Sequence, residues 1–451
     1  MSLCDDISNK AKTLQLDEFE VVLIQKKITT ARITDSEISE IKQNYDKSIA
    51  LRIIHNKKIL SARMKNEDPE NIFENALQMK AYVTPKKFWR SLPYPTKITK
   101  LEKTWDKTLD DISSDKVIDM ANAMINSTLH EKIKSVSGSL NIVSEYFQIA
   151  NSNDLNYSDK ATYISGTINA DSDNGSNPTS GIGFMSSRTM DSFSTDEIGK
   201  SAKEMCMDSI NPTKCDSGQY SIILEPYALG ELLAFVFSYN FNLKTYYDKR
   251  SCFADKLGYE IASKDFSLMD DPHSPDGIGS KPFDDEGTLT SPRYLIESGK
   301  FTNVFSDCFN AFKEGVDSSG NASRPGSPMG RDAQPVPIPS THNLKVIPGK
   351  TTKDEVIKDT KNGILVGRLW YTYPVNPERG DFSCTARSGI RIIKDGKITA
   401  PSKPVRIIHN LQLLLRNISA ICNDSRNVLQ WNALPCICPT IRVDAVNITS
   451  I

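Results

Sequence analysis

The sequence has no long apolar run, no excess charge of either sign and no leader-like N-terminus. No stretch reaches the roughly 18 consecutive apolar residues that a transmembrane helix needs, so we expect no membrane partner. The 55 basic residues are balanced by 56 acidic residues. Nucleic-acid-binding proteins usually carry a basic excess, so we expect no nucleic-acid partner either. Residues 1–15, MSLCDDISNKAKTLQ, lack the basic-then-apolar order of a signal peptide, and we expect a cytoplasmic protein.

Metal-binding spacing is missing as well. None of the five histidines lies within four residues of another or of a cysteine; they are His55, His130, His273, His342 and His409. The nine cysteines are spread along the chain, and their odd number suits reduced thiols better than a disulfide framework. No zinc-finger motif and no catalytic triad can therefore be assembled from neighbouring residues.

The sequence does have the composition of an ordinary globular protein, with 38% hydrophobic and 25% charged residues. Its first half alternates strand-like and helix-like patterns. We expect strands in 19–37 and 140–171, a hairpin over 48–65 that turns at 55–58, and helices over 68–83, 113–129 and 195–209. Asp68 and Thr195 are the expected N-caps of the first and last of these helices.

The second half is richer in strands and turns. A hairpin over 388–401 is predicted from Asp395–Gly396 at its turn, a helix over 410–422, and a terminal strand over 440–451. The Gly-, Pro- and Ser-rich segment 318–343 is expected to form a long loop. We predict an α+β fold, with an N-terminal α/β domain (1–205) that contains an antiparallel sheet. A C-terminal β-rich domain (206–451) would wrap around a central helix at 226–240.

That central helix lies in EPYALGELLAFVFSYN, residues 225–240. Pro226 suits a first helical turn, and Leu229, Leu232 and Val236 recur at helical spacing, so the segment is predicted to be a buried core helix. A metallopeptidase helix needs two histidines on one face and a glutamate beside them. Within the expected helix, residues 226–240, the lone carboxylate is Glu231.

Several segments together resemble the TldD/TldE family, also called PmbA or "modulator of DNA gyrase" proteins. The resemblance covers most of the chain and is carried by the order and spacing of these segments: SGIGFMSSRTMDSFSTDEIGKSAKEM (180–205), NPTKCDSGQYSIILEPYALGELL (211–233), PFDDEGTLTSPRYLIESGKF (282–301), SGNASR (319–324) and GDFSCTARSGIRIIKDGKITAPSKPVRIIHNLQLLLRNISAICND (380–424).

The resemblance implies a comparison with the zinc-binding branch, TldD. That branch carries His-Glu-x-x-x-His directly after an entry that matches Pro226, Gly230, Leu232 and Leu233. Here Ala234 and Phe235 stand in place of the first His and the Glu, and Tyr239 in place of the second His. The resemblance therefore implies no catalytic residue in this chain, no cofactor of its own, and a place in the TldE branch, which pairs with a TldD partner.

The resemblance also suggests weaker sites. The catalytic branch has a cysteine ligand near its C-terminus, where this chain has Cys436 and Cys438 without a surrounding Gly-rich loop. The acidic segment 284–287 and the segment 319–324 fall in the family's central cavity region. Asp285, Glu286, Asn321 and Arg324 are therefore candidates for substrate contact, with an ordinary turn and a solvent-exposed loop as the alternatives.

Two functions follow as hypotheses. The first is a non-catalytic subunit that pairs with a TldD-like zinc metallopeptidase in a heterodimer that degrades or matures peptides, with zinc in the partner and a peptide or unfolded polypeptide as substrate. The alternative is a divergent metallopeptidase whose metal has moved to Cys436, Cys438 and a histidine such as His409 or His273.

Overall fold

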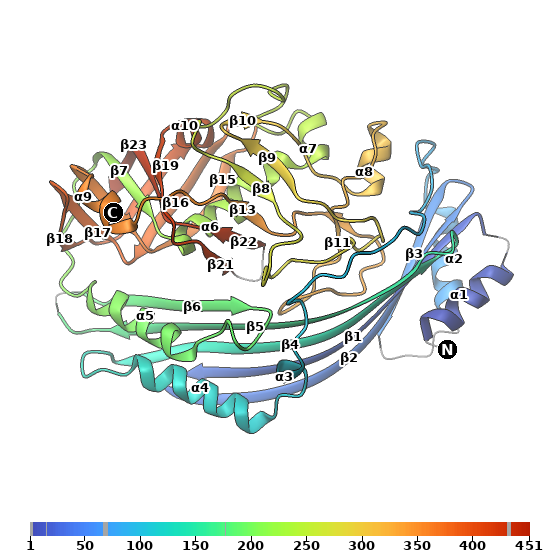
Figure 1. The fold of residues 1–451 in the computed structure, drawn as a ribbon, viewed down its shortest axis with the longest axis horizontal. Coiled ribbons are helices and arrows are strands. Elements are labelled where there is room, and N and C mark those ends of the chain that lie inside the picture. Colours follow the sequence, from blue (N-terminus) through green and yellow to red (C-terminus); the bar gives the residue numbers. More distant parts are fainter. Residues whose placement is uncertain (1–2, 15, 66–70, 176, 431–433) are drawn as a thin grey trace.

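The computed structural model describes residues 3–14, 16–65, 71–175, 177–430 and 434–451. Its N-terminal part is built on a six-stranded antiparallel sheet in the order β3-β2-β1-β4-β5-β6. The strands are β1 (Glu18–Thr34), β2 (Glu37–His55), β3 (Lys58–Lys65), β4 (Ser135–Asn151), β5 (Asn156–Ser172) and β6 (Thr179–Ser187). Figure 1 shows its long strands as a curved layer beneath the C-terminal part.

Helices cover one face of this sheet. They are α1 (Leu3–Thr13), α2 (Ile72–Gln78) with the 3₁₀ turn Met79–Ala81, α3 (Lys107–Asp110), α4 (Ser114–Thr128) and α5 (Thr195–Met207). Helices α1 and α2 pack on one end of the face, through Phe19, Val21 and Leu23 of β1. Helices α4 and α5 pack on the other end, around Ala31 and Ile33. The alternate residues of β1 point to the opposite face, as the period of a strand requires, and this face meets the C-terminal part.

Two further sheets build the C-terminal part. The larger has nine strands: β7 (Gly218–Leu224), β14 (Asn362–Val366), β15 (Arg368–Asn376), β16 (Asp381–Ser388), β17 (Arg391–Lys394), β18 (Lys397–Pro401), β19 (Val405–Asn410), β20 (Ile418–Ile421) and β23 (Ile441–Ser450). The smaller has six: β8 (Leu268–Asp270), β9 (Arg293–Glu297), β10 (Lys300–Phe301), β13 (Leu344–Val346), β21 (Arg426–Leu429) and β22 (Pro435–Cys438). A short ribbon joins β11 (Ala322–Ser323) to β12 (Ile338–Pro339).

Helix α6 (Pro226–Leu232) lies within the large C-terminal core, where residues of both sheets surround it. The remaining helices are short: α7 (Leu243–Tyr247), α8 (Cys308–Lys313), α9 (Lys353–Lys358) and α10 (Leu411–Arg416). The α+β architecture with an antiparallel N-terminal sheet and a β-rich part around a central helix is confirmed. The domain boundary at 205/206 stays a prediction.

Several local predictions are confirmed. The 48–65 hairpin turns at Asn56 and Lys57, both with positive φ, and the 388–401 hairpin turns at Asp395–Gly396. The terminal strand forms as β23, and most of 318–343 runs as loop.

Other local predictions are wrong. Ser194, not Thr195, caps α5, because the Ser194 side chain accepts the Glu197 amide proton. The helix expected over 410–422 ends at Arg416, and β20 follows it to pair with β23. The strands expected in 19–37 form one strand, β1, which continues unbroken to Thr34. The expected N-cap Asp68 lies outside the described residues. No helix in the described part of the chain is long and apolar enough to cross a membrane.

Candidate functional site

The segment at the expected ligand positions is not a continuous α-helix. Helix α6 gives way at Leu233–Phe237 to a π-helical turn, which is followed by a 3₁₀ turn over Ser238–Phe241. The prediction of a single α-helix over 226–240 is therefore wrong, because the segment changes from α to π and then to 3₁₀ geometry. The predicted burial of the segment is confirmed. π-helical turns are rare and occur often at functional sites.

This turn bears directly on the His-Glu-x-x-x-His spacing. Its two histidine positions, here Ala234 and Tyr239, are five residues apart. In an α-helix such residues lie about 140° apart around the axis and cannot share a ligand. Hydrogen bonds from i to i+5 widen the turn, and positions five apart then approach the same face. Ala234 and Phe235 lie in the π turn and Tyr239 in the 3₁₀ turn that follows it; that these three residues occupy the motif positions stays a prediction from the resemblance.

Glu231 is the one carboxylate of this helix, and it is buried. Its Oε1 accepts a hydrogen bond from Thr372 Oγ1 of β15 at 3.3 Å, and its Oε2 has no hydrogen-bond partner among the described residues. Burial raises the pKa of Glu231 to about 7, against the opposing effects of Arg368 and Thr372. A single carboxyl that is protonated for much of the time provides one weak ligand where zinc needs three or four.

Cys436 and Cys438 lie against the first turns of the same helix. The Cys436 thiol points to the Gly230 carbonyl at 3.8 Å, and the Cys438 thiol to the Pro226 carbonyl at 3.1 Å. Both side chains are buried, and burial raises the pKa of both thiols. Neutral thiols that donate to helix carbonyls act as packing groups, because a metal would require thiolates.

The two histidines of the alternative metal site are placed separately. His273 lies in a loop, where Nε2 is 3.1 Å from Thr290 Oγ1, and His409 lies on β19 opposite Phe382. Within the described ranges, no three His, Cys, Asp or Glu side chains gather where a metal ion could be held. The side chains that the structure describes therefore offer no donor set that fits a zinc ion.

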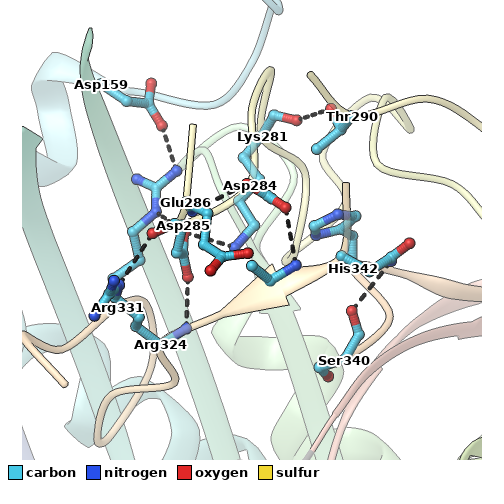
Figure 2. Close-up of polar contacts among 12 residues, drawn as sticks. Asp159, Lys281, Asp284, Asp285, Glu286, Thr290, Arg324, Arg331, Ser340 and His342 are labelled. Atoms are coloured by element: carbon cyan, nitrogen blue, oxygen red, sulfur yellow. Dashed lines mark hydrogen bonds and ion pairs between the residues drawn. The ribbon is translucent and has the colours of Figure 1, made fainter. Parts of the chain in front are cut away.

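The acidic segment 284–286 forms the centre of a buried ionic cluster (Figure 2). Asp285 Oδ1 accepts from Lys281 Nζ at 2.8 Å and from Arg331 Nε at 3.0 Å, while its Oδ2 accepts from the Arg324 amide at 2.6 Å. Burial opposes ionisation, but Lys281 and Arg331 outweigh it and lower the pKa of Asp285 to about 2. Asp284 accepts three backbone N–H groups, from Glu286, Thr288 and Ala322.

Charges on the inner face of the N-terminal sheet complete this cluster. Arg52 of β2 pairs with Glu20 of β1 at 2.6 Å and with Glu286 at 2.7 Å. Arg331 reaches Glu145 of β4 at 3.3 Å and Asp159 of β5 at 2.9 Å. The cluster therefore joins the N-terminal sheet to the 281–331 segment through groups that are almost all buried.

Arg324 and Asn321 are also committed to internal contacts. The Arg324 guanidinium donates to Glu20, to the Gln334 carbonyl and to the Asp285 carbonyl. The Asn321 amide donates to Asp270 at 2.6 Å. The four substrate-contact candidates lie in one region, but their polar groups already have partners inside the protein. Their contact with a substrate stays a prediction.

A small polar cavity adjoins the cluster, lined in part by Lys281, Asp285, Arg324, Arg331 and His342. Its volume is about 90 Å³, whereas pockets for small molecules measure roughly 300–1,000 Å³. The space suits a few water molecules better than a peptide side chain. His342 beside it is neutral, since burial lowers its pKa to about 3.

The sequence reading missed Glu20, Arg52, Glu145 and Arg331. A signal was present: Glu20 and Arg52 stand inside the apolar runs FEVVLI and IALRII. A charged residue within a buried strand is rarely fully buried unless it is paired, so these positions called for partners elsewhere in the chain.

These features define an α+β protein in which a buried helix, α6, is enclosed by strands of two sheets, and its class follows from the families it matches. Residues 217–450 match the family model "PmbA/TldA metallopeptidase C-terminal domain", and residues 107–209 match "PmbA/TldA metallopeptidase central domain". The chain belongs to the PmbA/TldD family.

Individual relatives agree with this assignment. The chain is 29% identical over 231 residues to a metalloprotease of Methanothermobacter thermautotrophicus, a match that covers 51% of this chain and 49% of that protein. It is 25% identical over 389 residues to the uncharacterized protein MJ0231 of Methanocaldococcus jannaschii, covering 84% and 86%. The crystal structure of TldE from Thermococcus kodakarensis superposes with a TM-score of 0.89 over 99% of both chains, and at 23% identity this likeness shows the shared fold.

Proposed function

We propose that this chain is a non-catalytic, TldE-like subunit that forms a cytoplasmic heterodimer with a TldD-like zinc metallopeptidase. The heterodimer degrades or matures peptides, and the partner holds the zinc ion. The observation that supports the proposal is that Ala234, Phe235 and Tyr239, none of which is a histidine or a glutamate, stand at the three positions predicted for the motif.

The chemistry of peptide hydrolysis supports this division of labour. A zinc peptidase ionises a bound water with the help of a neighbouring carboxylate. Methyl and phenyl side chains can neither bind the ion nor accept the proton, and the Tyr239 phenol alone does not make a zinc site. A subunit of this kind contributes by binding its partner, which stabilises both chains by mass action, and by helping to enclose the substrate.

The test combines elemental analysis with reconstitution. The full-length chain is purified alone and together with a TldD-like zinc metallopeptidase that carries His-Glu-x-x-x-His. We expect no zinc and no peptidase activity in the chain alone. The complex should contain one zinc per heterodimer and hydrolyse unfolded polypeptide in a chelator-sensitive manner. Substitution of the partner's motif histidines should abolish both zinc and activity.

A matched control tests the alternative site. Cys436→Ser in this chain should leave the zinc content and activity of the complex unchanged. Stoichiometric zinc in the isolated chain, lost on Cys436→Ser, would overturn the proposal in favour of the relocated metal. Chelator-sensitive peptide hydrolysis by the isolated chain would overturn it as well.

A further inference from the structure

An exposed apolar surface lies at one edge of the nine-stranded sheet. Strand β15 is the edge strand of this sheet. Five large side chains on β15, β19 and α10 are strongly exposed: Tyr371 (69%), Tyr373 (44%), Val375 (58%), Ile408 (57%) and Leu413 (50%). We refer to these five residues as the β15 patch. Exposed apolar clusters of this kind mark interaction surfaces more often than single exposed residues do.

Strand register places the centre of the patch in one row. Tyr373 of β15 lies opposite Ser383 of β16, which lies opposite Ile408 of β19, so the three side chains share one row on the outer face. Val375 lies at a second register shift, between Pro374 and Asn376, and α10, which carries Leu413, begins directly after β19. Ser383, between its two exposed neighbours, is buried, and its Oγ has no hydrogen-bond partner among the described residues.

The backbone of β15 supports a binding role. Tyr371 has a φ of 49°, a left-handed conformation that is unfavourable for a residue with a bulky side chain. It lies where the register between β15 and β16 shifts. Bulges of this kind redirect a side chain at functional positions, and here the strain accompanies an aromatic ring that is directed into solvent.

The charge beside the patch indicates the chemistry of the partner. Arg406 Nη2 donates to the Tyr373 hydroxyl at 3.1 Å, and Arg387 stacks over Trp370 with its guanidinium carbon 4.9 Å from the ring centroid. Arg387 also interacts electrostatically with Asp171, and both residues line one cavity. Exposed tyrosines next to arginines are the typical composition of an interface hot spot. Two copies of this surface would bring like charges together, whereas a partner with carboxylates would complement them.

We infer that the β15 patch is the surface by which this chain binds its TldD-like partner, and that the partner presents an apolar surface rimmed by carboxylates. This inference rests on the proposed function and specifies its interface. The partner would cover Tyr373 and Ile408 at the centre, and its carboxylates would pair with Arg387 and Arg406 at the rim.

The experiment measures the affinity of the full-length chain for the purified TldD-like homologue by titration calorimetry. Ile408→Glu places a carboxylate at the centre of the patch, facing an acidic partner. Ile398→Glu is the matched control, because Ile398 is a similarly exposed isoleucine on β18, the opposite edge strand of the same sheet. We expect Ile408→Glu to weaken binding at least about 30-fold, as loss of a hot spot does, and Ile398→Glu to leave it within twofold. Arg406→Gln should weaken binding and reduce its dependence on salt.

The outcomes separate this inference from the proposed function. If the wild-type chain binds the homologue and Ile408→Glu binds equally well, the surface assignment fails and the heterodimer stands. If the wild-type chain does not bind the homologue, the proposed function fails first. If the wild-type chain alone sediments as a dimer that Ile408→Glu dissociates, a second copy covers the patch and the inference is overturned. Melting temperatures of both isoleucine variants should match that of the wild type, because both side chains are exposed.

Discussion

Arg52 offers the sharpest test of the buried ionic cluster. Its guanidinium is buried between Glu20 and Glu286, with ion pairs of 2.6 and 2.7 Å. Arg52→Met keeps much of the side-chain length but removes the cation. Glu20 retains Arg324, whereas Glu286 keeps its hydrogen bonds with Cys308, including the one from the amide at 2.9 Å, but has no second ion pair among the described residues. Removing one partner of a buried ion pair typically costs about 3–5 kcal/mol, because the other charge stays buried without compensation.

The assay is equilibrium unfolding in urea, followed by tryptophan fluorescence. Arg63→Met is the control, since Arg63 pairs with Asp332 at 2.6 Å but both side chains are partly exposed. Such a pair contributes at most about 1 kcal/mol. In the double variant Arg52→Met/Glu286→Gln, the uncompensated carboxylate is gone, so we expect a large part of the lost stability to return.

The pH dependence gives a further check on the same cluster. Burial opposes the ionisation of Glu286, but Arg52 and the Cys308 amide lower its pKa below the ordinary value of 4.5. A lowered carboxyl pKa contributes stability that is present above the unfolded pKa and lost as the pH falls through the folded one. The deficit of Arg52→Met should therefore be larger at pH 7 than at pH 4. If Arg52→Met costs no more than Arg63→Met, or the double variant is no more stable than Arg52→Met alone, the cluster does not stabilise the protein as argued.

Three other predictions concern the central helix and the thiols. Because burial raises the pKa of Glu231 from 4.5 to about 7, the stability of the wild type should fall as the pH rises between these values. Glu231→Gln should be more stable than the wild type by about 3 kcal/mol at pH 8 and little different at pH 4.5. Equal urea midpoints for the two proteins at pH 8 would contradict this. If the π turn aligns positions five apart, Ala234→His/Tyr239→His should bind Ni²⁺ at least about tenfold tighter than Ala234→His/Ser238→His, as measured by calorimetry, and the reverse order would refute the alignment. All nine cysteines are buried, and burial raises the pKa of each thiol. None should therefore react with a thiol reagent within minutes in the native protein, whereas all nine should react in guanidinium. A thiol that reacts fast in the native state would show that its cysteine is accessible.

The elements that the sequence predicted well are those with strong local signals. The hairpin at Asn56–Lys57 follows from two apolar runs on either side of a polar turn, the hairpin at Asp395–Gly396 from its turn residues, and α4 from its apolar spacing. The failure at 410–422 has a physical cause. Ile418 and Ile421 continue the apolar pattern of α10, but pairing with β23 outweighs it, and such long-range pairing leaves no local trace.

The candidate site was predictable only in part. The residues Ala234, Phe235 and Tyr239 can be read from the sequence, but the π turn cannot, since its apolar pattern matches that of an ordinary core helix. The acidic segment was singled out from the sequence, but its burial in an ionic cluster was not predicted, and its contact with a substrate stays a prediction. Arg52 and Glu286 are 234 residues apart, so their pairing depends on a tertiary contact that no local pattern encodes.

The ionic cluster has a mechanical consequence for the whole molecule. Its members are anchored on β1, β2, β4 and β5 on one side and on the 281–331 segment on the other. Separating the two sides would expose several unpaired ions at once before water could solvate them, which makes a hinge at this seam unfavourable. The N-terminal sheet and the C-terminal part should therefore move together as one rigid body. If the chain acts in the proposed heterodimer, a polypeptide would have to bind between the two subunits, because the two parts of this chain do not separate.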